Sequence, residues 1–290
     1  MGKFALLCIF MIFVSYVLAK EECDEDAVFV RGKRHKKVVW LDNINRPYQL
    51  AYYKHKETLF FSYNIGLEEE DTFKIAYIHK HTHDLHLMEI ENGFTTAIDE
   101  HNHVVYFGGD IGIYKYHPEK NDSKVERIIH RQNIWNLFFK HHLYYIKYPT
   151  QMLYKVNFGS KVKTSERVDH IHEKIYQFAI DGKDDQYFTN DTGLFKIKNG
   201  TKERIHYHGE TVFRGMAVNS KGDIYFSGKH DIYVASNYFT RHLTLTCLIW
   251  NPRRNPRNPT TVKNDVVYES LRRSHYAGQK VNRNRPYSHY

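Results

Sequence analysis

The chain contains an internal repeat, in which a short aromatic-rich run returns about every 40 residues. The steps between equivalent positions of successive runs are 46, 41, 41 and 38 residues, for a common column made of Ala51, Ala97, Phe138, Ala179 and Ala217. Each run is followed by two further short runs of aromatic and β-branched residues, and turns rich in Gly, Asp and Asn separate them. A repeat of this length made of short strands is typical of a β-propeller, in which each repeat forms one four-stranded sheet.

The clearest copy of the repeat is Ile175–Ile197, which reads as three antiparallel strands in a meander. Helical solenoids also have repeats of about 40 residues. The units here show alternating runs of four to five residues and no helical period, and the chain holds 23 Tyr and 18 Phe. We therefore expect an all-β propeller with five recognisable repeats.

The two ends of the chain lie outside the repeats. Residues 1–19 read as a cleaved signal peptide, because Lys3 precedes an apolar segment that is shorter than the roughly 20 residues a membrane anchor needs. Residues 20–250 form the expected propeller domain. Residues 251–290 are rich in Pro, Asn and Arg where a sixth repeat is due, and we expect a disordered basic tail.

Two further segments interrupt the regular pattern. Val38–Leu41 is a strand candidate that stands alone before the first repeat. Gly66–Thr72, with four acidic residues, reads as a loop inserted into the first repeat, which explains why that repeat is the longest.

The net charge of +9 is concentrated in the tail. Residues 251–290 account for +7 of it and Lys3 for +1 more, which leaves residues 20–250 at +1. A nearly neutral body does not favour nucleic acid or a membrane as its partner. The tail alone is compatible with an arm that attaches to anionic surfaces.

Glycosylation sequons and cysteines fit an exported protein. The three sequons begin at Asn121, Asn190 and Asn199, and each falls in an expected turn. Cys23 and Cys247 remain after removal of the signal peptide, and they are either a disulfide pair that ties the two ends together or two separate thiols.

Equivalent positions at the start of each repeat suggest a ligand site. Three residues before the common column stand four aromatic residues and one arginine, namely Tyr48, Phe94, Trp135, Tyr176 and Arg214. The next position holds residues able to form hydrogen bonds, among them Gln49, Asn136 and Gln177. If both rows reach the mouth of the central channel, they form an aromatic-walled site for a small molecule. The competing interpretation is that the aromatic rings only pack between blades, since residues alternate sides along a strand and only one of two adjacent rows points fully inward. The sequon at Asn190 is expected to lie away from this site.

Two other groups of residues suggest metal chemistry. The run HKHTHDLH places four histidines close together, at positions 79, 81, 83 and 86, but a solvated turn is the favoured interpretation. Asp99 and Asp181 follow equivalent runs, as the acids of metal-dependent lactonase or esterase propellers do, yet both also suit the start of a turn. No metal site, cofactor or catalytic residue is expected, and hydrolysis is kept as the alternative function.

Several long motifs, found in order, resemble the ommochrome-binding proteins of moths and butterflies. They are RPYQLAYYKHKETLFFSYN, FKIAYI, ENGFTTAIDEHNHVVYFGGDIGIYKY, NIWNLFFKHHLYYI and FAIDGKDDQYFTNDTGLFK, and the match runs from about Cys23 to Val234. The resemblance implies a secreted haemolymph protein of six repeats that carries tryptophan-derived ommochrome pigments and catalyses no reaction. It also implies that Val38–Leu41 completes the last blade. We also expect the protein to be a monomer. The sequence departs from the family after about Tyr238, where the family continues through a sixth repeat.

Overall fold

The computed structural model describes residues 27–30, 33–36, 38–41, 44, 47–66, 71–159, 163–207, 213–228, 232–235 and 240–243. The chain divides into two compact units. The first contains an antiparallel hairpin of β1 (Ala27–Val30) and β2 (Lys33–Lys36). Residues 1–19, Cys23, Cys247 and the tail from 251 lie outside the described residues, so the predictions that concern them stay predictions.

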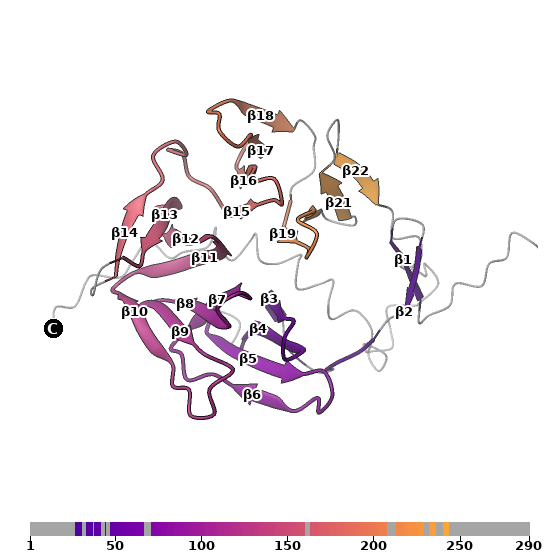
Figure 1. Ribbon diagram of the computed structural model, residues 1–290, viewed down its shortest axis with the longest axis vertical. Helices are drawn as coiled ribbons and strands as arrows, with labels where there is room; N and C mark the ends of the chain where they lie inside the picture. The colour runs from indigo at the N-terminus through magenta and orange to yellow at the C-terminus, as the bar shows by residue number, and fades with distance from the viewer. Residues whose placement is uncertain are drawn as a thin grey trace, which may run out of the picture. The chain divides into compact units, whose positions relative to one another are not determined.

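The second unit consists of five four-stranded sheets, each built from strands consecutive in the chain (Figure 1). The first sheet holds β3 (Pro47–Tyr53), β4 (Thr58–Asn64), β5 (Phe73–His79) and β6 (Leu85–Leu87). The second holds β7 (Gly93–Asp99), β8 (Val104–Gly109), β9 (Gly112–Tyr116) and β10 (Glu126–His130). The third holds β11 (Asn133–Lys140), β12 (His142–Tyr148), β13 (Met152–Asn157) and β14 (Thr164–Arg167). The fourth holds β15 (Gln177–Ile180), β16 (Gln186–Asn190), β17 (Gly193–Ile197) and β18 (Arg204–Tyr207). The fifth holds β19 (Gly215–Val218), β20 (Ile224–Ser227), β21 (Ile232–Ala235) and β22 (Thr240–Leu243).

This arrangement confirms the predicted five-repeat β-propeller. The first strand of each sheet contacts the first strand of the next, from β3 through β7, β11 and β15 to β19. The meander expected over Ile175–Ile197 is β15, β16 and β17. The described residues contain no helix, and therefore none that is long and apolar enough to cross a membrane.

The common column of the repeat pairs with an aromatic residue on the second strand of every sheet. In three sheets a small alanine lies opposite a tyrosine, as in the pair Ala179 and Tyr187. The remaining two pairs are Ala51 with Phe60 and Phe138 with Tyr144. An aromatic ring opposite a small side chain fills the space between strands without crowding.

The hydrophobic core lies between successive sheets. Phe60 of the first sheet and Phe107 of the second share one buried cluster, and their rings lie 5.6 Å apart. Comparable clusters join the second sheet to the third, the third to the fourth and the fourth to the fifth. Face-to-face packing of this kind is what the propeller architecture requires.

One strand prediction is wrong. Val38–Leu41 is not a strand, and Val38 and Val39 are exposed. Trp40 and Leu41 instead pack against a cluster on β4 and β5 that includes Phe61. The apolar pair thus covers the side of the first sheet, and this burial replaces strand pairing as the reason for its hydrophobicity.

The acidic insertion in the first repeat connects β4 to β5, as predicted. Asn64 closes its base, because its side-chain oxygen accepts hydrogen bonds from the backbone N–H groups of Gly66 and Thr72. Its amide nitrogen donates to Asp71 at 2.5 Å. The insertion therefore leaves the pairing of β4 with β5 in register.

Candidate functional site

In the first three sheets, the predicted site residues fall where the inner strands are irregular. Phe94 is skipped in the pairing of β7 with β8, and Trp135 is skipped in the pairing of β11 with β12. In β3 the residues Gln49 and Leu50 are skipped, and Gln49 has a φ of +49°. Three repeats therefore carry a β-bulge at equivalent places, and bulges re-aim side chains, often beside functional sites.

The structure brings three of the predicted aromatic residues into one line. The ring centroids of Tyr48 and Phe94 lie 6.0 Å apart, and those of Phe94 and Trp135 lie 5.7 Å apart. Tyr48 is buried, whereas Phe94 and Trp135 are half-buried. This line runs across the first three sheets, and offset and tilted rings at these distances attract one another.

Two further aromatic residues, which the sequence analysis missed, pack against the line. Phe73, the first residue of β5, lies 5.5 Å from Tyr48 and 4.7 Å from Phe94. Tyr148, the last residue of β12, stacks on Trp135 at 6.1 Å. Both stand at strand ends next to the bulges, a position that the repeat alignment on first strands did not cover.

The polar row also gathers at this end of the inner strands. Asn136 donates its side-chain N–H to Gln49 at 3.4 Å, although the two residues belong to the third and first sheets. The bulges explain why both rows come together here, since an extra residue suspends the strict alternation of side chains.

Gln177 carries a polar atom with an unmet hydrogen-bond requirement. Its side-chain oxygen is buried and accepts no hydrogen bond within the described part of the chain. The hydroxyl oxygen of Thr189, its partner across β15 and β16, is in the same condition. Buried polar groups are nearly always satisfied, so these atoms suit the N–H or O–H groups of a bound molecule or of water.

Tyr176 and Arg214 occupy equivalent places just before the inner strands of the fourth and fifth sheets. The backbone N–H of Tyr176 donates to the Thr189 carbonyl at 2.8 Å, and that of Arg214 donates to the Ser227 carbonyl at 2.7 Å. Trp135 reaches this position, because its indole N–H donates to the Tyr176 carbonyl at 3.0 Å. Tyr176 and Arg214 are both half-buried.

The phenol of Tyr176 has an acidic neighbour. It donates to a carboxylate oxygen of Asp191 at 2.5 Å. Burial and this carboxylate raise the pKa of Tyr176 to about 12, so the phenol stays neutral at physiological pH.

The expectation that Asn190 lies away from the site is wrong. Asn190 ends β16, and antiparallel pairing brings the end of β16 beside the start of β15, where Tyr176 stands. Its neighbour Asp191 contacts the Tyr176 phenol directly. Asn121 and Asn199, by contrast, are exposed in turns, as predicted.

The histidine run does not converge on one point. His79 shares a hydrogen bond with Thr58, His81 contacts Glu57 and His86 stacks on Tyr77. The side chains of His79 and His86 belong to strands β5 and β6, and His83 lies in the turn between them. The favoured interpretation as a solvated turn therefore holds for His81 and His83, whereas His79 and His86 lie in the strands on either side of that turn.

The carboxylates of Asp99 and Asp181 accept hydrogen bonds within the turns that these residues begin. Asp181 accepts hydrogen bonds from the backbone N–H groups of Lys183 and Asp185, at 2.8 and 3.0 Å, through a single carboxylate oxygen. Asp99 accepts from the backbone and the side chain of Asn102. Both acids stand at the opposite end of the inner strands from the aromatic line.

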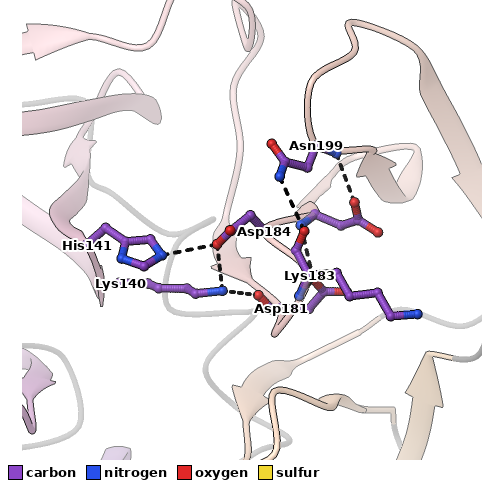
Figure 2. Close-up of polar contacts among 7 residues, drawn as sticks. Lys140, His141, Asp181, Lys183, Asp184 and Asn199 are labelled. Carbon is purple, nitrogen blue, oxygen red and sulfur yellow. Dashed lines mark hydrogen bonds and ion pairs between the residues drawn. The ribbon is translucent and has the colours of Figure 1, made fainter.

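Figure 2 shows that the turn around Asp181 also ties the third sheet to the fourth. The Lys140 ammonium donates to the Asp181 carbonyl and pairs with Asp184 at 2.8 Å. His141 lies 3.2 Å from the same Asp184 oxygen. These contacts give the acidic residues of this turn a structural role between sheets.

Comparison with solved structures confirms the propeller fold. A gluconolactonase from Xanthomonas campestris aligns with a TM-score of 0.56 at 11% identity, over 77% of this chain and 86% of that one. A chain of a nidogen/laminin complex aligns with a TM-score of 0.52 at 8% identity, over 71% of this chain and 82% of that one. At such low identity the likeness concerns the fold alone. No model of a known protein family matches the chain.

Sequence comparison finds a relative that covers most of the chain. The ommochrome-binding protein of Manduca sexta is 28% identical over 237 residues, which are 81% of this chain and 83% of that protein. The match therefore spans the repeats rather than one motif. With the propeller repeats in place along this length, the chain is similar to this ommochrome-binding protein over most of its length.

Proposed function

We propose that this chain is a secreted, non-enzymatic, monomeric protein of the haemolymph that binds and carries an ommochrome-like pigment. The observation that carries the proposal is the aromatic line of Tyr48, Phe94 and Trp135 in a relative of an ommochrome-binding protein. Three equivalent bulges present this line at one end of the inner strands.

The chemistry of the ligand matches the residues at this end. A flat, fused aromatic molecule derived from tryptophan stacks on half-buried rings, and Phe94, Trp135 and Tyr176 offer such rings. The neutral Tyr176 phenol adds no charge that would repel an amino-acid carboxylate. Arg214 is the cation of the row and is suited to pair with that carboxylate.

The amide groups complete the proposed site. Gln49, Asn136 and Gln177 supply donors and acceptors, and the buried Gln177 oxygen suits an amino group or ring N–H of the ligand. A site with aromatic walls and a few directed polar groups is the usual form of a small-molecule site.

Quenching of Trp135 fluorescence by xanthommatin tests the proposal. The chain holds three tryptophans, so replacing Trp40 and Trp250 by phenylalanine leaves Trp135 as the single reporter. We expect saturable quenching at micromolar pigment. Arg214→Ala in this background should weaken binding by about tenfold, which corresponds to roughly 1.4 kcal/mol. Absence of saturable quenching, or quenching that Arg214→Ala leaves unchanged, contradicts the proposed site.

Hydrolysis is the second candidate, because a gluconolactonase is among the similar folds. It requires a metal near Asp99 and Asp181, whose carboxylates instead accept hydrogen bonds within their own turns. Lactone turnover that a chelator abolishes, and that Asp181→Asn removes without unfolding the protein, would favour this candidate.

A further inference from the structure

Three side chains that the proposed pigment site does not use converge between the first two sheets. His55 lies in the turn between β3 and β4, His103 in the turn between β7 and β8, and Glu119 in the connection between β9 and β10. One nitrogen or oxygen atom from each residue lies within 4.8 Å of the other two. Within the described part of the chain, no other group of three histidine, cysteine or acidic side chains has its ligand atoms this close together.

A buried tyrosine fixes two members of this group. Tyr53 is fully buried, and its phenol donates to a Glu119 oxygen, Oε1, at 2.6 Å. The same phenol oxygen lies 2.8 Å from Nδ1 of His103.

These contacts determine which ring nitrogen of His103 is available. The phenol gives its single proton to Glu119, so Nδ1 of His103 must donate its own hydrogen to the phenol oxygen. A neutral imidazole protonated at Nδ1 has its lone pair on Nε2. The hydrogen-bond network thus prepares His103 as a ligand through the other nitrogen, in the way that partners of metal-binding histidines fix the tautomer.

His55 faces the oxygen of Glu119 that Tyr53 leaves open. Its Nε2 lies 3.8 Å from Glu119 Oε2, and the rings of His55 and His103 have their centroids 4.7 Å apart. The Lys56 ammonium is 3.7 Å from the same oxygen. Lys56 is partly exposed and donates to the Pro118 carbonyl, so it is able to move into water when a dication approaches.

We propose that His55, His103 and Glu119 bind a divalent transition-metal ion, with zinc as the best match. Two imidazoles and one carboxylate are a typical zinc ligand set, and three protein ligands leave a fourth tetrahedral position for water. Calcium and magnesium prefer sites made of oxygen atoms.

The spacing permits coordination after a small movement. The centre of a triangle with sides of 4.8 Å lies about 2.8 Å from each corner, and zinc binds nitrogen and oxygen at about 2.1 Å. For the three atoms that have this spacing, the movement needed is at most roughly 0.7 Å each. The His55 side chain is 57% exposed and lies in a turn, so this adjustment meets little resistance.

Calorimetric titration of Zn²⁺ into the mature protein tests the site. We expect one saturable site that His103→Ala abolishes and that also raises the melting temperature when occupied. His55→Ala serves as the variant least able to disturb folding, because this side chain is exposed, and it should weaken zinc binding by at least tenfold. Tyr53→Phe keeps all three ligands and should weaken zinc binding by about 10- to 100-fold through loss of positioning.

His81→Ala is the matched control. His81 is also an exposed histidine beside a glutamate, at 2.8 Å from Glu57, but it belongs to the histidine run and not to the proposed site. Zinc binding that survives His55→Ala and His103→Ala unchanged, or that His81→Ala removes instead, would overturn the proposal. Failure of the wild-type protein to bind Zn²⁺ at millimolar concentration would overturn it as well. The proposal is independent of pigment binding.

Discussion

Replacement of Trp135 by leucine should weaken both the fold and pigment binding, and a matched control separates the two effects. Trp135 contributes two ring pairs, with Phe94 at 5.7 Å and Tyr148 at 6.1 Å, and each is worth about 0.5–1.5 kcal/mol. Its indole N–H bond to the Tyr176 carbonyl adds about 1 kcal/mol. We expect Trp135→Leu to lower the free energy of unfolding by roughly 2–4 kcal/mol.

The same strand offers a control at its other end. Phe139 is also a half-buried aromatic residue of β11, and it stacks on Tyr106 at 5.8 Å. Phe139→Leu removes one ring pair and should lower the free energy of unfolding by about 1 kcal/mol. Because Phe139 lies away from the aromatic line, its replacement should leave the dissociation constant of xanthommatin unchanged.

Urea denaturation and equilibrium dialysis on the same preparations separate the two effects. Trp135→Leu should raise the dissociation constant of xanthommatin by about tenfold or more, since a stacking partner worth roughly 1.4 kcal/mol is lost. Trp135→Phe keeps a ring, so it should cost about 1 kcal/mol of stability and bind nearly as well. If Trp135→Leu and Phe139→Leu change binding equally, Trp135 only packs between blades and the reasoning fails.

Two further predictions concern the propeller itself. Gly112 has a φ of +152°, and a Cβ atom there would lie 1.9 Å from the Ile129 carbonyl oxygen, so Gly112→Ala should cost roughly 3 kcal/mol in urea denaturation. Gly159→Ala, where a Cβ meets nothing within 4 Å, should be nearly neutral. Burial, with a smaller effect of Asp99, raises the pKa of Tyr106 to about 12. The contribution of the neutral Tyr106 phenol to the free energy of unfolding is therefore fully present below about pH 10 and is lost as the pH rises through about 12. Tyr106→Phe should reduce this loss of stability at alkaline pH, measured by urea denaturation between pH 9 and 12.

The repeat predicted the fold well because each unit is nearly self-contained. The common column pairs small residues with aromatic residues in the second strand, and this pairing recurs in sheets that are far apart in the chain. The prediction of a strand at Val38–Leu41 is wrong because a short apolar run is compatible both with a paired strand and with a segment that covers a neighbouring sheet. Trp40 does the latter, with its ring 6.0 Å from Tyr52.

The candidate site was predictable only in part. Alignment of the repeats identified Tyr48, Phe94 and Trp135, but bulges are a property of strand pairing and leave no simple mark in the sequence. Phe73 and Tyr148 were not predicted, because they lie on the third and second strands of their sheets and the repeats were aligned on the first strands. The group of His55, His103 and Glu119 was missed for a related reason, since its members come from three separate turns.

Protein purified from its native source should carry a tryptophan-derived pigment. The absorption spectrum and mass of the small molecule that co-purifies with the protein are the quantities to measure. We expect a visible chromophore with the mass of an ommochrome, bound in stoichiometric amount. A stoichiometric ligand without a visible chromophore, or protein that carries no ligand and does not take up xanthommatin when it is supplied, would contradict it.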